Sequence, residues 1–331
     1  MKKICYMPGD DTGQDLMKEA LKVLNAVGKY ELVEAEIGYS AFQKYGTALP
    51  QETIDKATEA DAILFSALTS PPDTISNYRS GIVGLRQKLE MYANVRPCKS
   101  MPNTNSMRDD IDMVIVRENT EGMYSGIEWK EGDTAYAKRV ISKKGCDRVI
   151  RYAFEYAKKH GRKKVTVVHK ANVLRQTCGM FLETGKRIAE EYPGIEMEDV
   201  IIDAMAMRLI KHPQNFDVIV TTNLFGDILS DEAAQLIGGL GMTPSMNYGD
   251  EHALFEPTHG SCPKYAGKDV VNPCATLLSV AMMFDYLGEK KNHENLSNAI
   301  YQTLSEAKVL TKDLGGTAGT SGMVDEIIKK L

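Results

Sequence analysis

Short apolar runs alternate with longer amphipathic stretches along almost the whole chain. The runs are bounded by polar or turn residues, as is typical of buried strands. We expect strands at 3–7, 61–65, 112–116, 164–168, 197–202 and 218–222, and an extended segment at 92–96 that ends at Pro97. In the longer stretches the apolar residues recur at helical spacing. We expect helices at 15–27, 52–59, 81–91, 146–160, 171–192 and 277–287.

Strands that alternate with helices in this way predict an α/β fold, with a large, mostly parallel sheet flanked by helices. The length of 331 residues is sufficient for two domains. The turn after the first predicted strand, residues 9–13, reads Gly-Asp-Asp-Thr-Gly. It is not G-x-G-x-x-G, so the Rossmann dinucleotide fingerprint is absent.

Composition narrows the classes of function. A net charge of -5 argues against nucleic acid as the main partner. No apolar run approaches the roughly 20 residues that span a bilayer, and the N-terminus enters a strand without a signal-peptide pattern. The six cysteines are widely spaced, with no CxxC pair, and are expected to be reduced thiols. We therefore expect a cytoplasmic protein without a membrane partner.

The stretch 221–232 carries the clearest chemical signal. It follows an apolar strand and continues at helical spacing after Gly226, so Asp227 and Asp231 lie four residues apart on one helix face. The two carboxylates repel each other, and neither has a Lys or Arg partner at helical spacing. A divalent cation, Mg²⁺ or Mn²⁺, would remove this repulsion. Alternatively, Asp227 caps the helix and Asp231 faces water.

Other polar side chains stand at or near the ends of the predicted strands. In parallel sheets, ligands gather beyond the carboxyl ends of the strands. Arginines bind carboxylates through two hydrogen bonds, which suits a di- or tricarboxylic acid. Each residue alone is more often a surface charge, but together they indicate a site. The candidates are Arg86, Arg96, Arg117, Tyr124, His169, Lys170, Asp203 and Asn223.

Four motifs resemble the isocitrate/isopropylmalate dehydrogenase family, whose members are metal-dependent β-decarboxylating dehydrogenases. They are residues 92–97, 203–207, 221–231 and 259–261, and the resemblance extends over the whole chain. It implies NAD(P)-dependent oxidative decarboxylation of a 3-substituted malate. It also implies a family fold that binds the dinucleotide without the Rossmann fingerprint.

The resemblance implies a domain division and an assembly. Residues 1–97 plus 243–331 would form the large dinucleotide-binding domain, and 98–242 the small domain with the substrate and metal residues and the dimer interface. In the implied homodimer, Asp227 and Asp231 of one subunit hold the metal together with Asp203 of the other.

The resemblance also assigns roles to the remaining candidates. Arg86, Arg96 and Arg117 would bind the malate carboxylates. Lys170 would accept the proton of the hydroxyl group, and Tyr124 would protonate the enolate. Regulatory subunits in this family lose the catalytic tyrosine or the metal aspartates. Because this chain keeps them, an enzyme is favoured over a non-catalytic binding subunit.

The substituent at C3 of the substrate would be recognised near the start of the helix at 81–91. Isocitrate enzymes carry Ser and Asn two positions apart, whereas this chain has Ser80 and Ile82. Isopropylmalate enzymes are apolar here, as Ile82 and Val83 are, but have an acidic residue where Arg79 stands. Arg79 suits a longer carboxylate arm, so isocitrate and homoisocitrate rank ahead of 3-isopropylmalate. The sequence does not favour either of these two tricarboxylates over the other.

The cofactor signal is mixed. The pair Lys264 and Tyr265 resembles NADP-using relatives, whereas residues 311–316, which include Lys312, resemble NAD-using ones. We favour NADP slightly over NAD, and use of both stays open. The other residues assigned to the cofactor are His259, Gly260 and Asn272. The opening turn departs from the family, because Asp11 replaces a glycine and tolerates a positive φ less easily.

Overall fold

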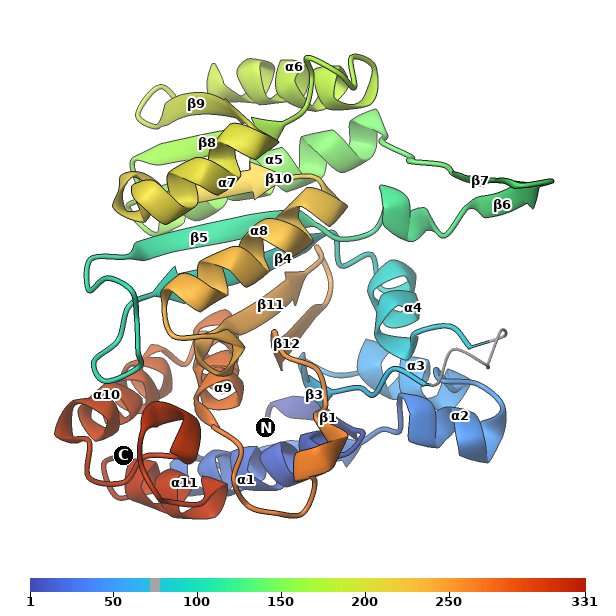
Figure 1. The fold of residues 1–331 in the computed structure, drawn as a ribbon. Coiled ribbons are helices and arrows are strands. Elements are labelled where there is room, and N and C mark those ends of the chain that lie inside the picture. The colour runs from blue at the N-terminus through green and yellow to red at the C-terminus, as the bar shows by residue number, and fades with distance from the viewer. Residues whose placement is uncertain (72–77) are drawn as a thin grey trace. The chain divides into compact units, whose positions relative to one another are not determined.

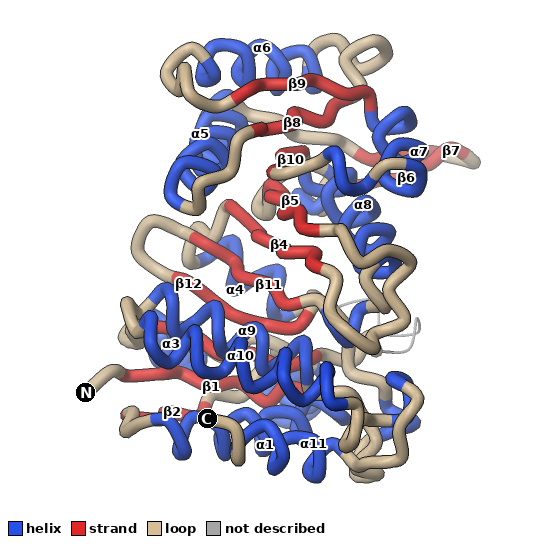
Figure 2. Tube along the Cα trace, turned by 90° about the vertical axis from the view of Figure 1, so that its left-hand side faces the viewer, coloured by secondary structure: helices blue, strands red, loops and turns tan. Residues whose placement is uncertain are grey.

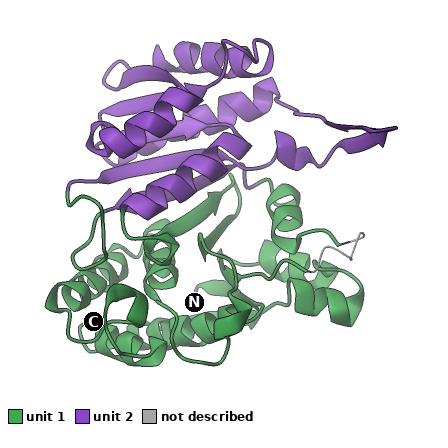
Figure 3. Cartoon of the chain, viewed as in Figure 1, with its two compact units in different colours: residues 1–90, 100–109, 237–331 green, residues 91–99, 110–236 purple. Residues whose placement is uncertain are grey.

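The computed structural model describes residues 1–71 and 78–331. They divide into two compact units, coloured separately in Figure 3. Unit 1 comprises Met1–Glu90, Ser100–Asp109 and Ile237–Leu331, and unit 2 comprises Met91–Lys99 and Asp110–Leu236.

Unit 1 is built on five strands, in the order β2(Glu31–Glu34), β1(Lys3–Gly9), β3(Ala62–Ala67), β12(Ala253–Pro257) and β11(Pro244–Tyr248). Neighbours in this order are parallel except β11, which is antiparallel to β12. Every residue of β3 and β12 is buried, which fits the apolar runs at residues 62–65 and 253–255. The helices of unit 1 are α1(Thr12–Val27), α2(Tyr39–Tyr45), α3(Gln51–Thr58), α4(Gly81–Lys88), α9(Cys274–Tyr286), α10(Lys290–Glu306) and α11(Thr320–Ile328).

Unit 2 contains strands in the order β4(Ala93–Lys99), β5(Asp112–Glu118), β10(Val218–Thr221), β8(Lys164–His169) and β9(Glu196–Ile201). All are parallel except β4, which is antiparallel to β5. Helices α5(Lys143–Lys159) and α6(Thr177–Ala189) cover one face, and α7(Ile202–Lys211) and α8(Asn223–Leu236) cover the other. Figure 2 shows α5 and α8 on opposite sides of β5 and β10. These layers confirm the predicted α/β class, with mostly parallel strands flanked by helices.

A separate hairpin extends away from the strands of unit 2 (Figure 1). Its strands are β6(Glu128–Glu131) and β7(Thr134–Ala137), and every residue in them is exposed. Trp129 stacks on Tyr136, with ring centroids 5.1 Å apart. This stacking stabilises the hairpin, whose strand residues are all exposed.

Several predicted boundaries were wrong. The helix expected at 171–192 begins only at Thr177, because the backbone N–H groups of Val173 and Leu174 turn back to the carbonyl of Lys170. The strand expected to end at Pro97 continues to Lys99, since β4 pairs with β5 over its whole length and Pro97 stands opposite Val114.

Two changes from strand to helix occur earlier than predicted. Strand β9 ends at Ile201, so Asp203 lies in the first turn of α7 rather than at the end of a strand. Helix α8 begins at Asn223, before Gly226. Arg117 and His169 lie inside β5 and β8, not after them.

The predicted domain boundary at residue 97 lies inside β4. The structure places this strand in unit 2 and returns the chain to unit 1 for residues 100–109.

No helix among residues 1–71 and 78–331 is long and apolar enough to cross a membrane.

Candidate functional site

The site in unit 2 is organised by the junction of β10 and α8. All four residues of β10 are buried between β5 and β8, and Asn223, the first residue of α8, is buried as well. Gly226 lets α8 approach β5, because a Cβ there would lie 2.6 Å from Cβ of Arg117. The first turns of α8 therefore pack directly against the arginine.

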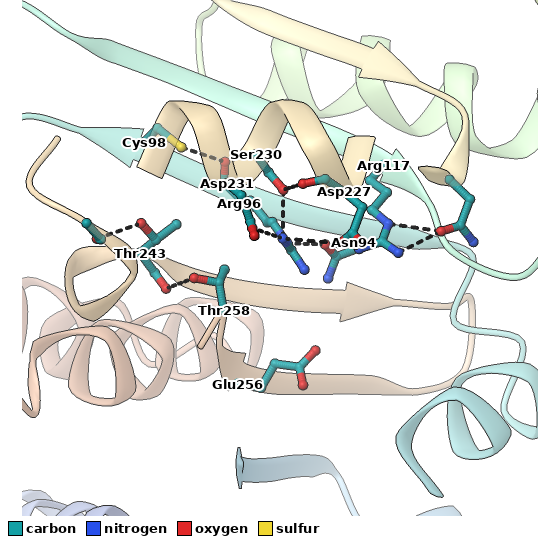
Figure 4. A network of polar contacts seen from close by, with 12 residues as sticks. Asn94, Arg96, Cys98, Arg117, Asp227, Ser230, Asp231, Thr243, Glu256 and Thr258 are labelled. Carbon is teal, nitrogen blue, oxygen red and sulfur yellow. Dashed lines mark hydrogen bonds and ion pairs between the residues drawn. The ribbon is translucent and has the colours of Figure 1, made fainter. Parts of the chain in front are cut away.

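Asp227 and Asp231 face two arginines from neighbouring strands (Figure 4). Nη1 of Arg117 donates to Oδ1 of Asp227. Nη1 of Arg96 lies 3.8 Å from Oδ1 of Asp227 and 3.5 Å from Oδ1 of Asp231. Both carboxylates therefore converge on one guanidinium. No Lys or Arg stands at helical spacing from either aspartate, and the partners come instead from β4 and β5.

The two guanidinium groups are held by further polar contacts within unit 2. Nε of Arg96 donates to Oδ1 of Asn94 at 2.7 Å, and its Nη1 donates to Oγ of Ser230 at 2.6 Å. Oδ1 of Asn223 accepts Nε and Nη2 of Arg117, at 3.0 and 2.7 Å. Both arginines are buried, so their positive charges are fixed in place beside the carboxylates.

Tyr124 belongs to the same cluster. Its hydroxyl donates to Oδ2 of Asp227 at 2.5 Å, and Cζ of Arg117 lies 4.9 Å from the centroid of its ring. Burial, followed by the hydrogen bond to Asp227, raises the pKa of the phenol, while Arg117 opposes the shift. The phenol therefore stays protonated at neutral pH and is available as a proton donor.

The loop that carries Tyr124 is held by Glu118, which was not among the predicted site residues, and by the candidate Asn223. The buried carboxylate of Glu118 accepts the backbone N–H groups of Thr120 and Glu121, at 2.9 and 3.0 Å. Nδ2 of Asn223 donates to the carbonyl of Glu121 at 3.1 Å. Asn223 therefore joins Arg117 to the Tyr124 loop. The position of Asn223 directly after an apolar strand marks it as a candidate in the sequence, but the sequence does not show its partners.

Lys170 and Asp203 form a second pair in unit 2. Lys170 follows β8, and its Nζ lies 2.6 Å from Oδ1 of Asp203 in the first turn of α7. The hydrogen bond from Lys170 lowers the pKa of the Asp203 carboxyl. Neighbouring His169 is bonded to Asp199 and to the backbone N–H of Ala171, so its ring has structural contacts.

A single chain does not assemble the predicted set of three metal ligands. Residues 1–71 and 78–331 contain no group of three or more His, Cys, Asp or Glu side chains placed to hold a metal ion. Asp203 thus does not complete a site with Asp227 and Asp231 of its own chain. The two converging carboxylates of α8 fit a hard divalent cation as part of a ligand set.

In unit 1, Arg86 donates from Nη2 to Oε1 of Glu256, a buried carboxylate that also accepts Nδ2 of Asn247 at 2.6 Å. Nε of Arg86 is buried and has no hydrogen-bond partner among the described residues. A buried donor without a partner fits the binding of an anionic ligand. Arg79 and Ser80 are exposed just before α4, whose first turn contains the half-buried Ile82 and Val83.

The residues predicted to bind the cofactor also lie in unit 1. Nδ1 of His259 is 3.0 Å from the carbonyl of Gly260, and its buried Nε2 has no partner among the described residues. Burial lowers the pKa of His259, so Nε2 is a free acceptor at neutral pH. A buried acceptor of this kind fits a bound dinucleotide.

The two cationic cofactor candidates, Lys264 and Lys312, are exposed. Lys264 and Tyr265 are exposed in a short 3₁₀ turn, Pro263–Tyr265, with Nζ of Lys264 4.7 Å from the ring centroid of Tyr265. Buried Asn272 donates to Oδ2 of Asp313 at 3.0 Å, beside exposed Lys312.

Known proteins resemble this chain over its whole length. The family described as isocitrate/isopropylmalate dehydrogenase matches residues 3–327. Homoisocitrate dehydrogenase of Methanocaldococcus jannaschii is 52% identical, over 99% of this chain and 97% of the relative. The 3-isopropylmalate/3-methylmalate dehydrogenase of that organism is 48% identical, over 100% and 99%. The crystal structure of isocitrate dehydrogenase from Methylococcus capsulatus has a TM-score of 0.96 at 44% identity, covering 100% of this chain and 99% of that one.

The contacts of Asn223 lead to a stability prediction. Asn223→Ala removes the acceptor shared by two Arg117 donors and leaves the Glu121 carbonyl without its side-chain donor. We expect the free energy of unfolding to fall by about 1–3 kcal/mol, the usual cost of losing buried hydrogen bonds to a charged group. Urea denaturation measures it. The matched control is Asn215→Ala, at an exposed asparagine of unit 2, with an expected change within about 0.5 kcal/mol. Equal losses in the two variants would contradict the bridging role of Asn223.

Proposed function

Because the chain belongs to the isocitrate/isopropylmalate dehydrogenase family, we propose that it acts on a tricarboxylic member of the family's substrates, isocitrate or homoisocitrate. The chain is a β-decarboxylating dehydrogenase, which oxidises a 3-substituted malate with NAD(P) and releases CO₂. The observation that carries the finer proposal is Arg79, exposed beside the first turn of α4. A cation there suits a third carboxylate and offers little to an isopropyl group.

The proposed function gives each candidate residue a role. Arg86, Arg96 and Arg117 would bind the two malate carboxylates. Lys170 would take the proton from the C2 hydroxyl group, and Tyr124, held in its protonated form, would return a proton to carbon after CO₂ leaves. A divalent ion, Mg²⁺ or Mn²⁺, when bound by the aspartates, would polarise the C2 oxygen, and the dinucleotide would accept the hydride.

We propose a homodimer that shares the metal ligands, with Asp227 and Asp231 from one subunit and Asp203 from the other. Two features support it. A single chain has no complete ligand set among its described residues, as noted above. Helices α7 and α8 also expose apolar side chains that a second subunit would bury. These side chains are Met207, Ile210, Leu224 and Ile228.

The ion pair between Lys170 and Asp203 extends this proposal. If Asp203 belongs to the site of the other subunit, Lys170 belongs to that same site, because the two side chains are bonded to each other. Each site would then combine Tyr124 and the α8 aspartates of one chain with Lys170 and Asp203 of its partner.

Subunit mixing tests the shared site. Asp203→Asn and Asp227→Asn should each be nearly inactive alone, because each removes a metal ligand from both sites of its dimer. In a mixed dimer, one site carries both substitutions and the other carries neither. Co-refolded mixtures should therefore recover about a quarter of wild-type activity, as random pairing of two subunits requires. Inactive mixtures in which native mass spectrometry detects mixed dimers would rule out sharing.

Initial rates with three substrates test the proposed substrate class. With Mn²⁺ and either dinucleotide, kcat/KM for isocitrate or homoisocitrate should exceed that for 3-isopropylmalate by about tenfold or more. Arg79→Ala should reduce this preference, whereas Lys88→Ala, at an exposed lysine at the end of α4, should not.

Other outcomes of the same assay select the alternatives. A preference for 3-isopropylmalate would mean that Ile82 and Val83 define the pocket. A 48% identical relative is named 3-isopropylmalate/3-methylmalate dehydrogenase. No turnover with any of the three would favour another substituent at C3 or a non-catalytic binding subunit.

For the cofactor, we propose NADP ahead of NAD, because exposed Lys264 and Tyr265 supply a cation and a hydroxyl group for the 2′-phosphate. His259 would accept a hydrogen bond from the dinucleotide at Nε2. Gly260, Asn272 and Lys312 complete the proposed cofactor residues.

Lys264→Asp should lower the ratio of kcat/KM for NADP to that for NAD by about tenfold, since a repelling charge replaces a charge-assisted hydrogen bond. Steady-state kinetics with both dinucleotides measure the ratio. Lys268→Asp is the matched control, at an exposed lysine four positions further along the chain. The assignment of Lys264 fails if the two variants change the ratio equally.

A further inference from the structure

Asp11 occupies the position just before α1, where an aspartate normally caps the helix. A capping aspartate has an extended backbone and accepts an N–H group of the first turn. Asp11 instead has φ 49° and ψ -120°, and its side chain makes no capping hydrogen bond. Aspartate is uncommon at positive φ, although less so than most residues. The carboxylate must therefore have other contacts that hold it there.

The carboxylate of Asp11 joins two other loops of unit 1. Its Oδ2 accepts the hydroxyl of Thr69, which follows β3, and the hydroxyl of Ser261, which follows β12 and lies 3.2 Å away. The two hydroxyl groups also contact each other. Strands β1, β3 and β12 are consecutive neighbours in the sheet, so these three loops leave the same edge side by side.

Neighbouring residues strengthen the connection to the segment 261–267. Oγ1 of Thr12 donates to the carbonyl of Ser261 at 3.3 Å. At the other end of the segment, Oδ2 of Asp15 accepts the backbone N–H of Gly267 at 2.7 Å. The start of α1 thus holds the segment 261–267 at both ends.

Asp10, one residue earlier, shows that this is a distinct arrangement. Its carboxylate accepts the backbone N–H groups of Tyr39, Ser40 and Thr69, at 2.9, 2.9 and 3.1 Å. Asp10 therefore joins the start of α2 to the loop after β3, whereas only Asp11 and Asp15 of these aspartates contact the segment 261–267.

We propose that Asp11 and Asp15 are positioning residues that hold the segment 261–267 for dinucleotide binding. This inference rests on the proposed function, because Lys264 and Tyr265, which lie between the two anchor points, are proposed there to bind the dinucleotide. Neither aspartate need touch the nucleotide. Each acts through a residue of the segment, Asp11 through Ser261 and Asp15 through Gly267, and fixes where the exposed side chains project.

Asp11→Gly is the first test, because it removes the carboxylate while accepting the positive φ. We expect Kd for NADPH, from fluorescence titration, to rise about three- to tenfold, as the loss of a charge-assisted hydrogen bond implies. The KM for the tricarboxylate and kcat at saturating dinucleotide should stay within about twofold. Amide hydrogen exchange should become faster at residues 259–267.

Two further variants separate positioning from a general structural effect. Glu90→Gly also replaces an acidic residue at positive φ (47°) by glycine, but at an exposed position outside these contacts, and should leave Kd and exchange unchanged. Asp11→Asn should restore much of the affinity, because asparagine tolerates positive φ and its amide oxygen can accept both hydroxyl groups. Unchanged Kd and exchange in Asp11→Gly, or equal effects in Glu90→Gly, would overturn the inference.

If Asp11→Gly does not fold, Asp15→Asn tests the second anchor by the same two measurements, and wild-type values there overturn the inference. Failure of the proposed function is a different result. It would appear as a wild-type chain that binds neither NADPH nor NADH. Hydrogen exchange needs no nucleotide, so wild-type exchange at 259–267 in Asp11→Gly would still overturn the inference, and faster exchange would still support the anchoring of the segment.

Discussion

Charge balance at the start of α8 is the constraint on which the candidate site depends. Arg96 and Arg117 have side chains only 7% and 3% exposed, and a buried guanidinium without a counter-charge is strongly destabilising. Asp227 contacts both arginines, and Asp231 lies near Arg96. Neither the arginines nor the aspartates can be understood alone. The cluster therefore holds two guanidinium groups and two carboxylates in one preformed arrangement, to which the proposed function assigns substrate carboxylates and a divalent cation.

The positions of these groups follow from the architecture of unit 2. The arginines come from β4 and β5, and the aspartates from the helix that packs on those strands, with Gly226 allowing the close approach. Asn223 fixes the orientation of Arg117 and also the loop of Tyr124. Rigid strands and a buried amide set the geometry before any ligand binds, which favours precise binding. The pair Lys170–Asp203 lies on other elements of the unit, and the proposed dimer gives this pair a site to serve.

Much of the fold was predictable where strands such as β3 and β10 are buried over their whole length, because their apolar runs are easy to recognise. The pair Asp227 and Asp231 was likewise visible, since helical spacing alone brings them to one face. The arginine partners were not, because they depend on tertiary pairing of β4 and β5 with α8. Some predicted element boundaries were wrong for local reasons. Strand β9 continues into α7 without a polar residue between them, and Pro97 is tolerated inside β4. The turns after Lys170 share the apolar composition of a helix, so periodicity did not exclude them.

Asp10 and Asp11 show where pattern reasoning reaches its limit. Adjacent and chemically identical, they have different tasks: one carboxylate accepts three backbone N–H groups, and the other accepts two side-chain hydroxyl groups. A substitution of glycine by aspartate at positive φ looks only costly in the sequence. In the structure, the same backbone conformation aims the carboxylate at Thr69 and Ser261 rather than at the helix. The departure from the family pattern is therefore coupled to contacts elsewhere in unit 1. Those contacts, rather than the turn alone, account for an aspartate at this position.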